Sequence, residues 1–417
     1  MELLLVPRPL FQNNMTVEGY YMAAQFGNTI LDSQRANPFD RAMDSPFIDF
    51  MNEVGLDALT QNKLVFIPVT QIQLVTDLHA CVKTDNEKVV FLLDETVPID
   101  SITEARCKYY TELGYSFAVV FDGSLENLKL IEPYVKYIFL KYTGKMAELS
   151  TVIKRTFPQC TVIGMDIADK VFFDNITMNE TAKISLYDGS FYKVHVTEEV
   201  DLARLSPLKA NYIQLLNIVN QEDFDFKKFA RTIMQDTGLA IQFMRLVNNA
   251  SKTRTEIRDF NQAAAMMGQK EIKKWVSTAV SNALCVDSPS EIMRLSLLRA
   301  KFCENLAKYF ELAMVADNIF LMGLFSVLDI VLDMPIEDAL KMVIVPPQVS
   351  NALINKSGQF YSVLYFAQQY EMGQWKEISR MALVRDISIS QIHFAYKEAM
   401  LWYSNLINTK IDQSGIE

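Results

Sequence analysis

The side chains that most often carry chemistry are sparse in this sequence, and their spacing excludes the common metal and phosphate sites. The histidines, His79, His195 and His393, lie far apart, and none has a second His or a Cys three or four residues away. A paired-ligand motif such as HExxH is therefore absent. The sequence also contains no GxxxxGK[ST], GxGxxG or GxSxG segment. We expect surface or capping roles for the histidines rather than metal binding.

Carboxylates are the remaining candidates for chemistry. Asp94 and Glu95 follow a run that is typical of a buried strand, and Asp122 follows a second such run. In a barrel of parallel strands, acids at the carboxyl ends of strands are placed to hold divalent metals. Acids at such positions also cap the helices that follow, because the helix N-terminus attracts negative charge. The spacing alone favours the capping role.

Composition and charge exclude several classes of protein. The chain has 417 residues, of which 50% are hydrophobic and 22% charged, as in a globular protein with a full core. Lys and Arg number 40 against 50 Asp and Glu, and the net charge of −10 disfavours a nucleic-acid or anionic-membrane partner. The five cysteines form no CxxC pair, and the N-terminus lacks the basic start and long apolar run of a signal peptide. We therefore expect a cytoplasmic protein.

The elements that would position these acids alternate through the first half of the chain. Short β-rich runs are separated by stretches with helical spacing, such as residues 102–113, which is the pattern of a parallel sheet. The expected strands cover residues 3–6, 64–69, 89–93, 117–121, 137–140 and 161–165, with a weaker one at 184–187. The fold class predicted for residues 1–196 is a degenerate or truncated TIM-like (β/α) barrel, since a full barrel takes ~250 residues.

The pattern changes after Val196. A polar segment ends in the helix-start signal Ser206-Pro207. From there to Lys410 helical spacing dominates, and no convincing strand pattern is present. The sequence therefore predicts a second, all-helical domain over residues 197–417.

Segments of the first half resemble the EAL domain, in the order in which that family carries its motifs. Tyr20-Tyr-Met-Ala-Ala-Gln25 resembles the segment around the Glu-Ala-Leu signature. The later segments that match are residues 63–69, 89–95, 114–122, 138–141 and 162–166. The resemblance covers about residues 1–194. It implies a barrel in which acids and an Asn hold two divalent metals and a Lys and a Glu assist the water that hydrolyses cyclic di-GMP.

By this resemblance most of the metal-binding positions are replaced. Positions that hold oxygen ligands in active EAL domains carry Tyr21, Pro68, Leu92, Val120-Phe121 and Met165. These side chains supply almost none of the oxygens that Mg²⁺ or Mn²⁺ needs. The residues left at the degenerate pocket, which we predict as ligand-binding candidates, are Tyr21, Glu95, Asp122, Lys141, Asp166 and Asp188. We predict no catalytic residue, no metal and no cofactor, so the protein is not expected to be an enzyme.

The second half resembles the HDOD domain, a relative of the HD hydrolases that lacks their metal-binding His and Asp. Asp236-Thr-Gly-Leu239 stands where that family has an Asp-Pro-x-Leu turn, and Ile272-Lys-Lys-Trp275 matches its Leu-Arg-x-Trp pattern. The segment 243–250 resembles its Leu-Arg-x-x-Asn-Ser helix, with Asn249 in place of the Ser. This resemblance covers about residues 206–404. The EAL-like and HDOD domains in one chain are typical of bacterial signalling proteins.

The leading hypothesis is a non-catalytic signalling scaffold related to cyclic di-GMP signalling, which acts by protein–protein interaction. The partners implied by the resemblance are kinases, response regulators, or regulators of motility or biofilm formation, and a homodimer through the barrel. One alternative is a receptor that binds cyclic di-GMP or another nucleotide without hydrolysis. A second is a metal-dependent phosphodiesterase, which requires Glu95, Asp122, Asp166 and Asp188 to converge at one end of the barrel.

Overall fold

The chain forms two compact units. The computed structural model describes residues 3–26, 46–93, 97–193, 207–221, 223–250, 257, 259–284 and 290–414. One unit comprises Met1–Val194 together with Phe366–Glu417, and the other comprises His195–Tyr365. The second unit is shorter than the helical domain predicted over 197–417, because the last part of the chain packs with the barrel.

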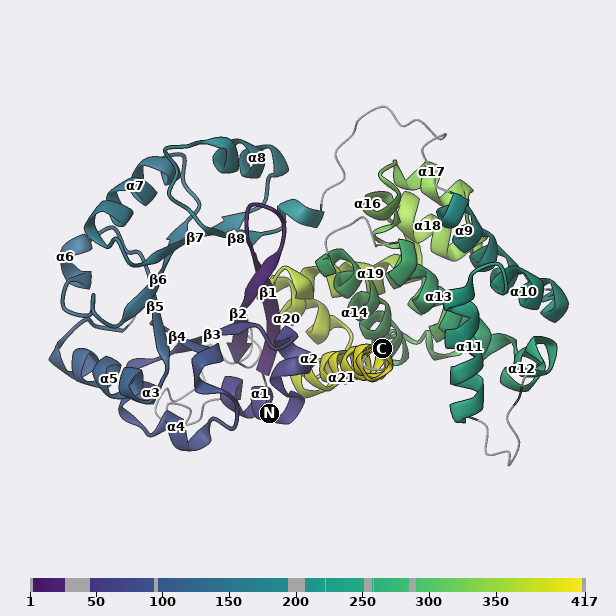
Figure 1. Ribbon diagram of the computed structural model, residues 1–417, viewed down its shortest axis with the longest axis horizontal. Coiled ribbons are helices and arrows are strands. Elements are labelled where there is room, and N and C mark those ends of the chain that lie inside the picture. Colours follow the sequence, from purple (N-terminus) through teal and green to yellow (C-terminus); the bar gives the residue numbers. More distant parts are fainter. Residues whose placement is uncertain are drawn as a thin grey trace. The chain divides into compact units, whose positions relative to one another are not determined.

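The first unit is built on a closed barrel of eight strands (Figure 1). The strands are β1 (Leu3–Phe11), β2 (Val17–Phe26), β3 (Leu64–Val69), β4 (Val89–Leu93), β5 (Ser116–Val120), β6 (Val135–Lys141), β7 (Thr161–Ile167) and β8 (Leu186–Gly189). Neighbours from β2 to β8 are parallel, and β1 runs antiparallel to both β2 and β8. The predicted (β/α) barrel is confirmed, and its ring of strands is complete, because β1 pairs with both of its neighbours.

Strand β2 is the one that the sequence pattern did not predict. Its ten residues include one β-branched side chain, so the usual strand signal is weak. Pairing on both sides compensates, with β1 in a hairpin and with β3 in parallel. Gly19 permits the close approach to β3, since a Cβ there would lie 2.9 Å from the carbonyl oxygen of Leu64.

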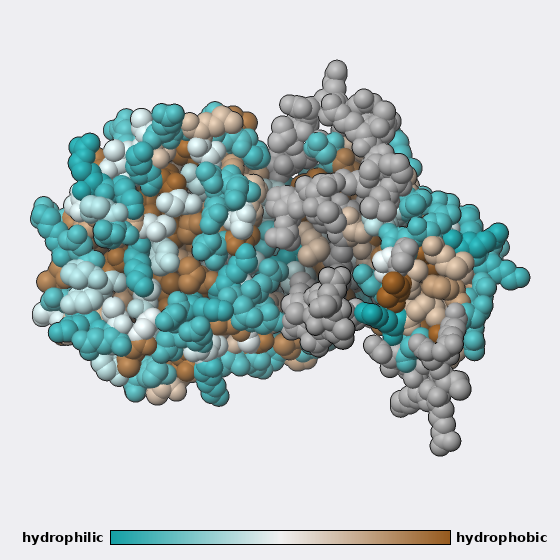
Figure 2. Space-filling model, viewed as in Figure 1, coloured by the Kyte–Doolittle hydropathy of each residue, from teal (hydrophilic) through white to brown (hydrophobic). Residues whose placement is uncertain are grey.

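The helices between the strands are short. They are α1 (Pro46–Val54), α2 (Leu56–Thr60), α3 (Gln71–Val75), α4 (Leu78–Cys81), α5 (Ser101–Glu112), α6 (Leu125–Leu128), α7 (Met146–Thr156) and α8 (Lys170–Met178). Figure 1 shows α5, α6, α7 and α8 outside the ring of strands. On the face seen in Figure 2, hydrophilic residues form most of the rim of this unit. The barrel domain is therefore short because its helices are short, and not because strands are missing.

The C-terminal helices complete this unit. Helix α19 (Gly358–Glu371) carries Tyr370, whose buried hydroxyl accepts from the Leu5 amide at 3.1 Å and donates to the Leu5 carbonyl at 2.8 Å. After α20 (Trp375–Val384), helix α21 (Ile389–Ser414) packs against β1 and α2, where Gln61 donates to the Tyr403 hydroxyl at 3.0 Å. These helices cover the first strand, which has no helix of its own before β2.

The second unit is helical throughout its described residues. Its helices are α9 (Pro207–Asn220), α10 (Phe226–Ile233), α11 (Thr237–Ala250), α12 (Phe260–Met267), α13 (Gln269–Leu284), α14 (Ser290–Leu306), α15 (Ala316–Phe325), α16 (Leu328–Leu332), α17 (Ile336–Lys341) and α18 (Pro347–Ile354). Phe229, Phe243 and Trp275 join three of these helices through ring contacts at 5.2 and 5.3 Å. No helix in the described ranges of the whole chain has the length and hydropathy that a membrane span requires.

Candidate functional site in the barrel

Apolar side chains from all eight strands fill the inside of the barrel. The buried cluster and the side chains packed against it comprise Leu10, Tyr21, Leu64, Phe66, Val90, Leu92, Ala118, Val120, Tyr137, Phe139, Ile163, Met165 and Leu186. Phe66 lies at the centre of the aromatic contacts, 4.9 Å from the ring of Tyr137 and 5.5 Å from that of Phe139. Tyr21 packs on Phe139 at 5.8 Å. The interior is thus a packed core.

The positions that the EAL resemblance marks as replaced ligands belong to this core. Leu92 and Met165 are 1% and 6% exposed. Pro68 pairs with Leu92 across β3 and β4, so two replaced positions lie side by side. Tyr21 and Val120 also pack against the cluster. Apolar contacts therefore occupy the places where metal ligands would be expected.

One polar cluster lies at the C-terminal end of the parallel strands, where barrel enzymes carry their active sites. Arg8 reaches from β1 to Asp188 in β8, and its Nε and Nη2 donate to the two carboxylate oxygens at 2.9 and 2.6 Å. The same Nη2 donates to Asp166 in β7 at 2.9 Å. The Asp166 amide also donates to Asp188, at 3.2 Å. Two of the six predicted pocket residues are therefore brought together, and an arginine joins them.

The backbone of β7 is shaped for this contact. Asp166 has a φ of 59°, in the left-handed region that Asp adopts more readily than most residues. The pairing register of β7 with β8 shifts between Gly164 and Ile167, as at a β-bulge. This irregularity takes the Asp166 amide out of the ladder and directs it to the Asp188 carboxylate.

Burial and charge act against each other in the cluster. The Asp188 side chain is fully buried, and burial raises its pKa, as does the negative charge of Asp166, while Arg8 opposes the rise. For Arg8, burial lowers the pKa, but the charges of Asp188 and Asp166 outweigh it and hold the guanidinium protonated. With one cation and two carboxylates, the formal charge of the cluster is −1.

Of the other predicted pocket residues, Tyr21 lies opposite Arg8 in the pairing of β1 with β2 and interacts with it electrostatically. Asp122 is exposed and accepts from the Ser124 amide at 2.8 Å, in the turn before α6, which agrees with a local structural role. Lys141 ends β6 and is exposed. Glu95 and the neighbouring Asp94 lie outside the described residues.

Among the described residues, the Arg8 cluster does not offer the donor set of a two-metal centre. Both oxygens of Asp188 accept hydrogen bonds from Arg8, and one also accepts the Asp166 amide, which uses most of the lone pairs that a metal would need. Within the part of the chain that the structure describes, no group of three or more His, Cys, Asp or Glu residues is arranged to hold a metal ion.

Arg8 is the residue of this cluster that the sequence reasoning missed. It is the one charged residue of β1, and it shares the parity of Leu10, which points into the barrel. If the strand had been extended over residues 3–11, the alternation of its side chains would have placed Arg8 on the face that points into the barrel. The signal was missed because the expected strand ended at Val6.

The helical unit carries the second set of motif residues. Asp236 accepts from the Leu239 amide at 2.9 Å and from the Tyr212 hydroxyl at 2.9 Å, and so fixes the start of α11 against α9. Asn248, in the segment 243–250, bonds both the amide and the carbonyl of Ile257, at 2.7 and 3.0 Å. These motif residues hold the fold of the helical unit together.

Comparison with known families identifies this unit. Residues 205–341 match the HDOD domain. This part of the chain is an HDOD domain. The predicted HDOD resemblance is confirmed, although the match ends at residue 341 rather than near 404 and lies entirely within the unit His195–Tyr365.

Two bacterial relatives are similar to the chain. It is 24% identical over 432 aligned residues to the uncharacterized protein YuxH of Bacillus subtilis, with 98% of this chain and 100% of YuxH covered. It is 27% identical over 226 residues to the cyclic di-GMP phosphodiesterase CdgJ of Vibrio cholerae, with 54% of this chain covered. The alignment spans 52% of CdgJ, so about half of that relative has a counterpart here.

EAL proteins are among the solved structures to which the chain is similar. The BlrP1 calcium and cyclic di-GMP complex of Klebsiella pneumoniae is 12% identical, with a TM-score of 0.38 and coverage of 46% of this chain and 55% of that one. An EAL domain protein of Listeria monocytogenes is 11% identical, with a TM-score of 0.35 and coverage of 46% and 87%.

Proposed function

We propose that the protein is a non-catalytic component of bacterial signalling related to cyclic di-GMP, in which the barrel no longer hydrolyses the nucleotide. The HDOD match and the similarity to a cyclic di-GMP phosphodiesterase support the signalling relation. The EAL resemblance of the sequence supports it from the barrel side.

The observation that carries the loss of hydrolysis is the ion pair of Arg8 with Asp188. Hydrolysis at a two-metal centre requires carboxylates that are free to ligate the ions. Here Asp188, which is fully buried at the end of the barrel, accepts hydrogen bonds from Arg8 at both carboxylate oxygens. The side chains at the other replaced positions supply almost no oxygen in compensation, since the Tyr21 hydroxyl is the one they offer.

Action through protein partners follows from the same reasoning. The HDOD domain resembles hydrolases without their metal-binding residues, and no group of three or more possible metal ligands is present among the described residues of either unit. Kinases, response regulators and regulators of motility or biofilm formation are the partner classes that this architecture suggests. Pull-down with the full chain as bait is the means to identify them.

The test of the barrel is calorimetric titration of the purified full chain with cyclic di-GMP, with and without Mn²⁺, followed by chromatography of the products. CdgJ, assayed in parallel, is the positive control for hydrolysis. We expect neither heat nor product. Metal-dependent product above the blank would overturn the proposal.

A receptor role is the outcome that metal-independent binding without turnover would establish. The net charge of −1 on the Arg8 cluster counts against it, because it repels phosphate groups. If binding is nevertheless measured, Lys141→Met is the first variant to compare. Lys136→Met, an exposed lysine nearer the start of the same strand, is the matched control.

A further inference from the structure

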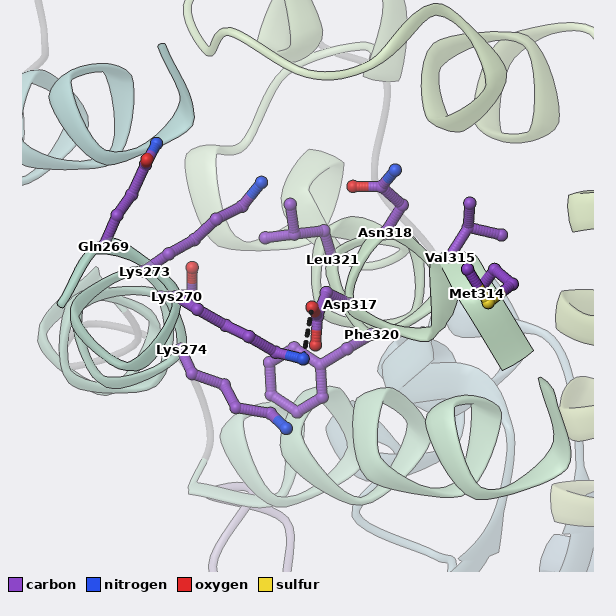
Figure 3. A pocket seen from close by; sticks show the side chains of 11 residues that line it. Gln269, Lys270, Lys273, Lys274, Met314, Val315, Asp317, Asn318, Phe320 and Leu321 are labelled. Carbon is purple, nitrogen blue, oxygen red and sulfur yellow. Dashed lines mark ion pairs between the residues drawn. The ribbon is translucent and has the colours of Figure 1, made fainter. Parts of the chain in front are cut away.

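The HDOD domain contains a cavity of about 280 Å³ between α13 and the segment 314–321, most of which belongs to α15 (Figure 3). Its size lies at the lower end of the range of ~300–1,000 Å³ that small-molecule sites occupy. All of its lining residues belong to the helical unit. The proposed function of the barrel makes no use of it.

The wall contributed by α13 is rich in lysine. Lys270, Lys273 and Lys274 line the cavity, and Asp317 is the single acid among the lining residues, so the formal charge is +3 − 1 = +2. This is a local positive site in a chain of net charge −10. Lys270 pairs with Asp317 at 3.2 Å, and Lys274 pairs with Glu304 at 2.5 Å. Two of the three lysines therefore already have a carboxylate partner.

Lys273 differs from its neighbours. It is half-buried, and within the described part of the chain it forms no ion pair. Burial lowers its pKa, and the charge of Asp317 offsets this only in part. Figure 3 shows its side chain extending from α13 past Leu321, on the side toward which Asn318 points. A partly desolvated ammonium that forms no ion pair with a described residue is a site for an anion.

Ser277 provides a second, independent observation. It follows Lys273 by four residues on α13, so both lie on the same face of the helix. Its side chain is fully buried and lines the cavity, and its Oγ has no hydrogen-bond partner in the described structure. A helical serine commonly donates to the carbonyl four residues earlier, and a buried hydroxyl without any partner is unfavourable. A ligand with an acceptor oxygen would satisfy it.

The remaining lining residues are the polar Gln269 and Asn318 and a group of apolar side chains. The apolar group includes Val315, Phe320 and Leu321. We propose that this cavity binds a small metabolite that carries a phosphate or carboxylate group on a short apolar body. The anionic group binds Lys273 and the Ser277 hydroxyl, and the body packs on Phe320 and Leu321.

The experiment titrates the full chain with three probes that share one ring: phenyl phosphate, benzoate and phenol. We expect saturable binding of at least one anion and none of neutral phenol. The relative affinity of the two anions tells which head group the site prefers. No saturable binding of either anion up to about 10 mM, or equal binding of phenol, would overturn the proposal.

Three variants test the residues. Lys273→Met should lower the affinity for the anionic probe by about tenfold or more, which is the usual effect of losing a charged hydrogen bond. Ser277→Ala should lower this affinity severalfold. The melting temperature should not fall, because the hydroxyl makes no hydrogen bond within the described structure. Lys228→Met removes an exposed lysine of α10 and should change nothing.

Each variant has an outcome that counts against the site. Equal weakening by Lys228→Met would show a general charge effect, and unchanged binding in Lys273→Met would exclude Lys273. If Lys273→Met does not fold, Lys273→Gln replaces it in the same comparison. A fall in melting temperature for Ser277→Ala without a change in affinity would assign the serine a structural role only.

Discussion

The pair of Arg8 and Asp188 makes a quantitative prediction, because its two partners can be removed separately and together. Removing one partner of a buried ion pair typically costs about 3–5 kcal/mol, since the other charge is left uncompensated. Arg8→Met leaves the fully buried Asp188 with one N–H bond, from the amide of Asp166, so we expect a loss near the lower end, about 3 kcal/mol. Asp188→Leu should cost less, about 2 kcal/mol, because the side chain of Arg8 is 23% exposed and keeps its 2.9 Å bond to Asp166.

The double variant Arg8→Met/Asp188→Leu should recover most of this loss. Two apolar side chains would then extend the core around Leu10 and Leu186, and replacing a buried pair in this way is often neutral. We expect it to lie within about 1 kcal/mol of the wild type. Urea unfolding, followed by hydrogen exchange of peptides from β1 and β8, measures the barrel separately from the helical unit.

A matched control is the exposed pair of Glu126 with Lys129 in and after α6, whose side chains are 79% and 55% exposed. A double-mutant cycle on such a pair should give a coupling below about 1 kcal/mol. If the losses from Arg8→Met and Asp188→Leu simply add in the double variant, the pair is not coupled and the reasoning is refuted.

The same variants carry a pH signature. Burial already raises the pKa of Asp188, and Arg8→Met removes the main group that opposes the rise. A carboxyl with a raised folded-state pKa contributes stability that is complete below its unfolded pKa of about 3.9 and is lost as the pH rises through the folded value. The deficit of Arg8→Met should therefore shrink as the pH is lowered toward the unfolded pKa of about 3.9. The double variant lacks the carboxyl and should show no such change. A deficit that grows on acidification would contradict this assignment.

Three further predictions concern other parts of the chain. Tyr370→Phe leaves the amide and carbonyl of Leu5 without their buried partner. It should lower the unfolding free energy of the barrel unit, measured in urea, by about 1–3 kcal/mol. An unchanged value would contradict the contact of α19 with β1. Iodoacetamide at pH of about 8, read by mass spectrometry, should modify exposed Cys81 and spare buried Cys107, because burial raises the pKa of the Cys107 thiol to about 12 and thiolate is the reacting form. Gly323→Ala should lower the melting temperature of the HDOD domain, since a Cβ there would lie 2.7 Å from the backbone of α14, and unchanged melting would show that the two helices can separate.

The sequence predicted the barrel wherever a strand carried its own signal. Strands β3 and β4 are apolar throughout and were predicted with their observed bounds, as expected for strands covered on both faces. Strand β2 carried little of that signal, because pairing with β1 and β3 stabilises it rather than its own composition. The contact of Leu5 with Tyr370 joins residues 365 positions apart, and no local pattern reports such a contact. That is why the C-terminal helices were assigned to the wrong unit.

The sequence placed some residues of the candidate site, and it did not reveal their main partner. The resemblance pointed to Leu92 and Met165 as apolar replacements, and both lie in the core. It also pointed to Asp166 and Asp188, which meet at the end of the barrel. What occupies their oxygens is Arg8, from a strand to which the resemblance assigned no role. A motif comparison marks single positions, whereas only the three-dimensional pairing shows which group lies against Asp166 and Asp188.

That compensation follows from electrostatics. A fully buried carboxylate such as Asp188 is strongly unfavourable unless a cation lies against it. At a metal centre the ions themselves supply the positive charge. In this barrel the guanidinium of Arg8 supplies the positive charge, and its two hydrogen bonds to Asp188 measure 2.9 and 2.6 Å. The fold can then retain Asp188 without any metal. An arginine in this place also repels divalent cations. The residue that compensates Asp188 is therefore the same one on which the proposed loss of hydrolysis rests.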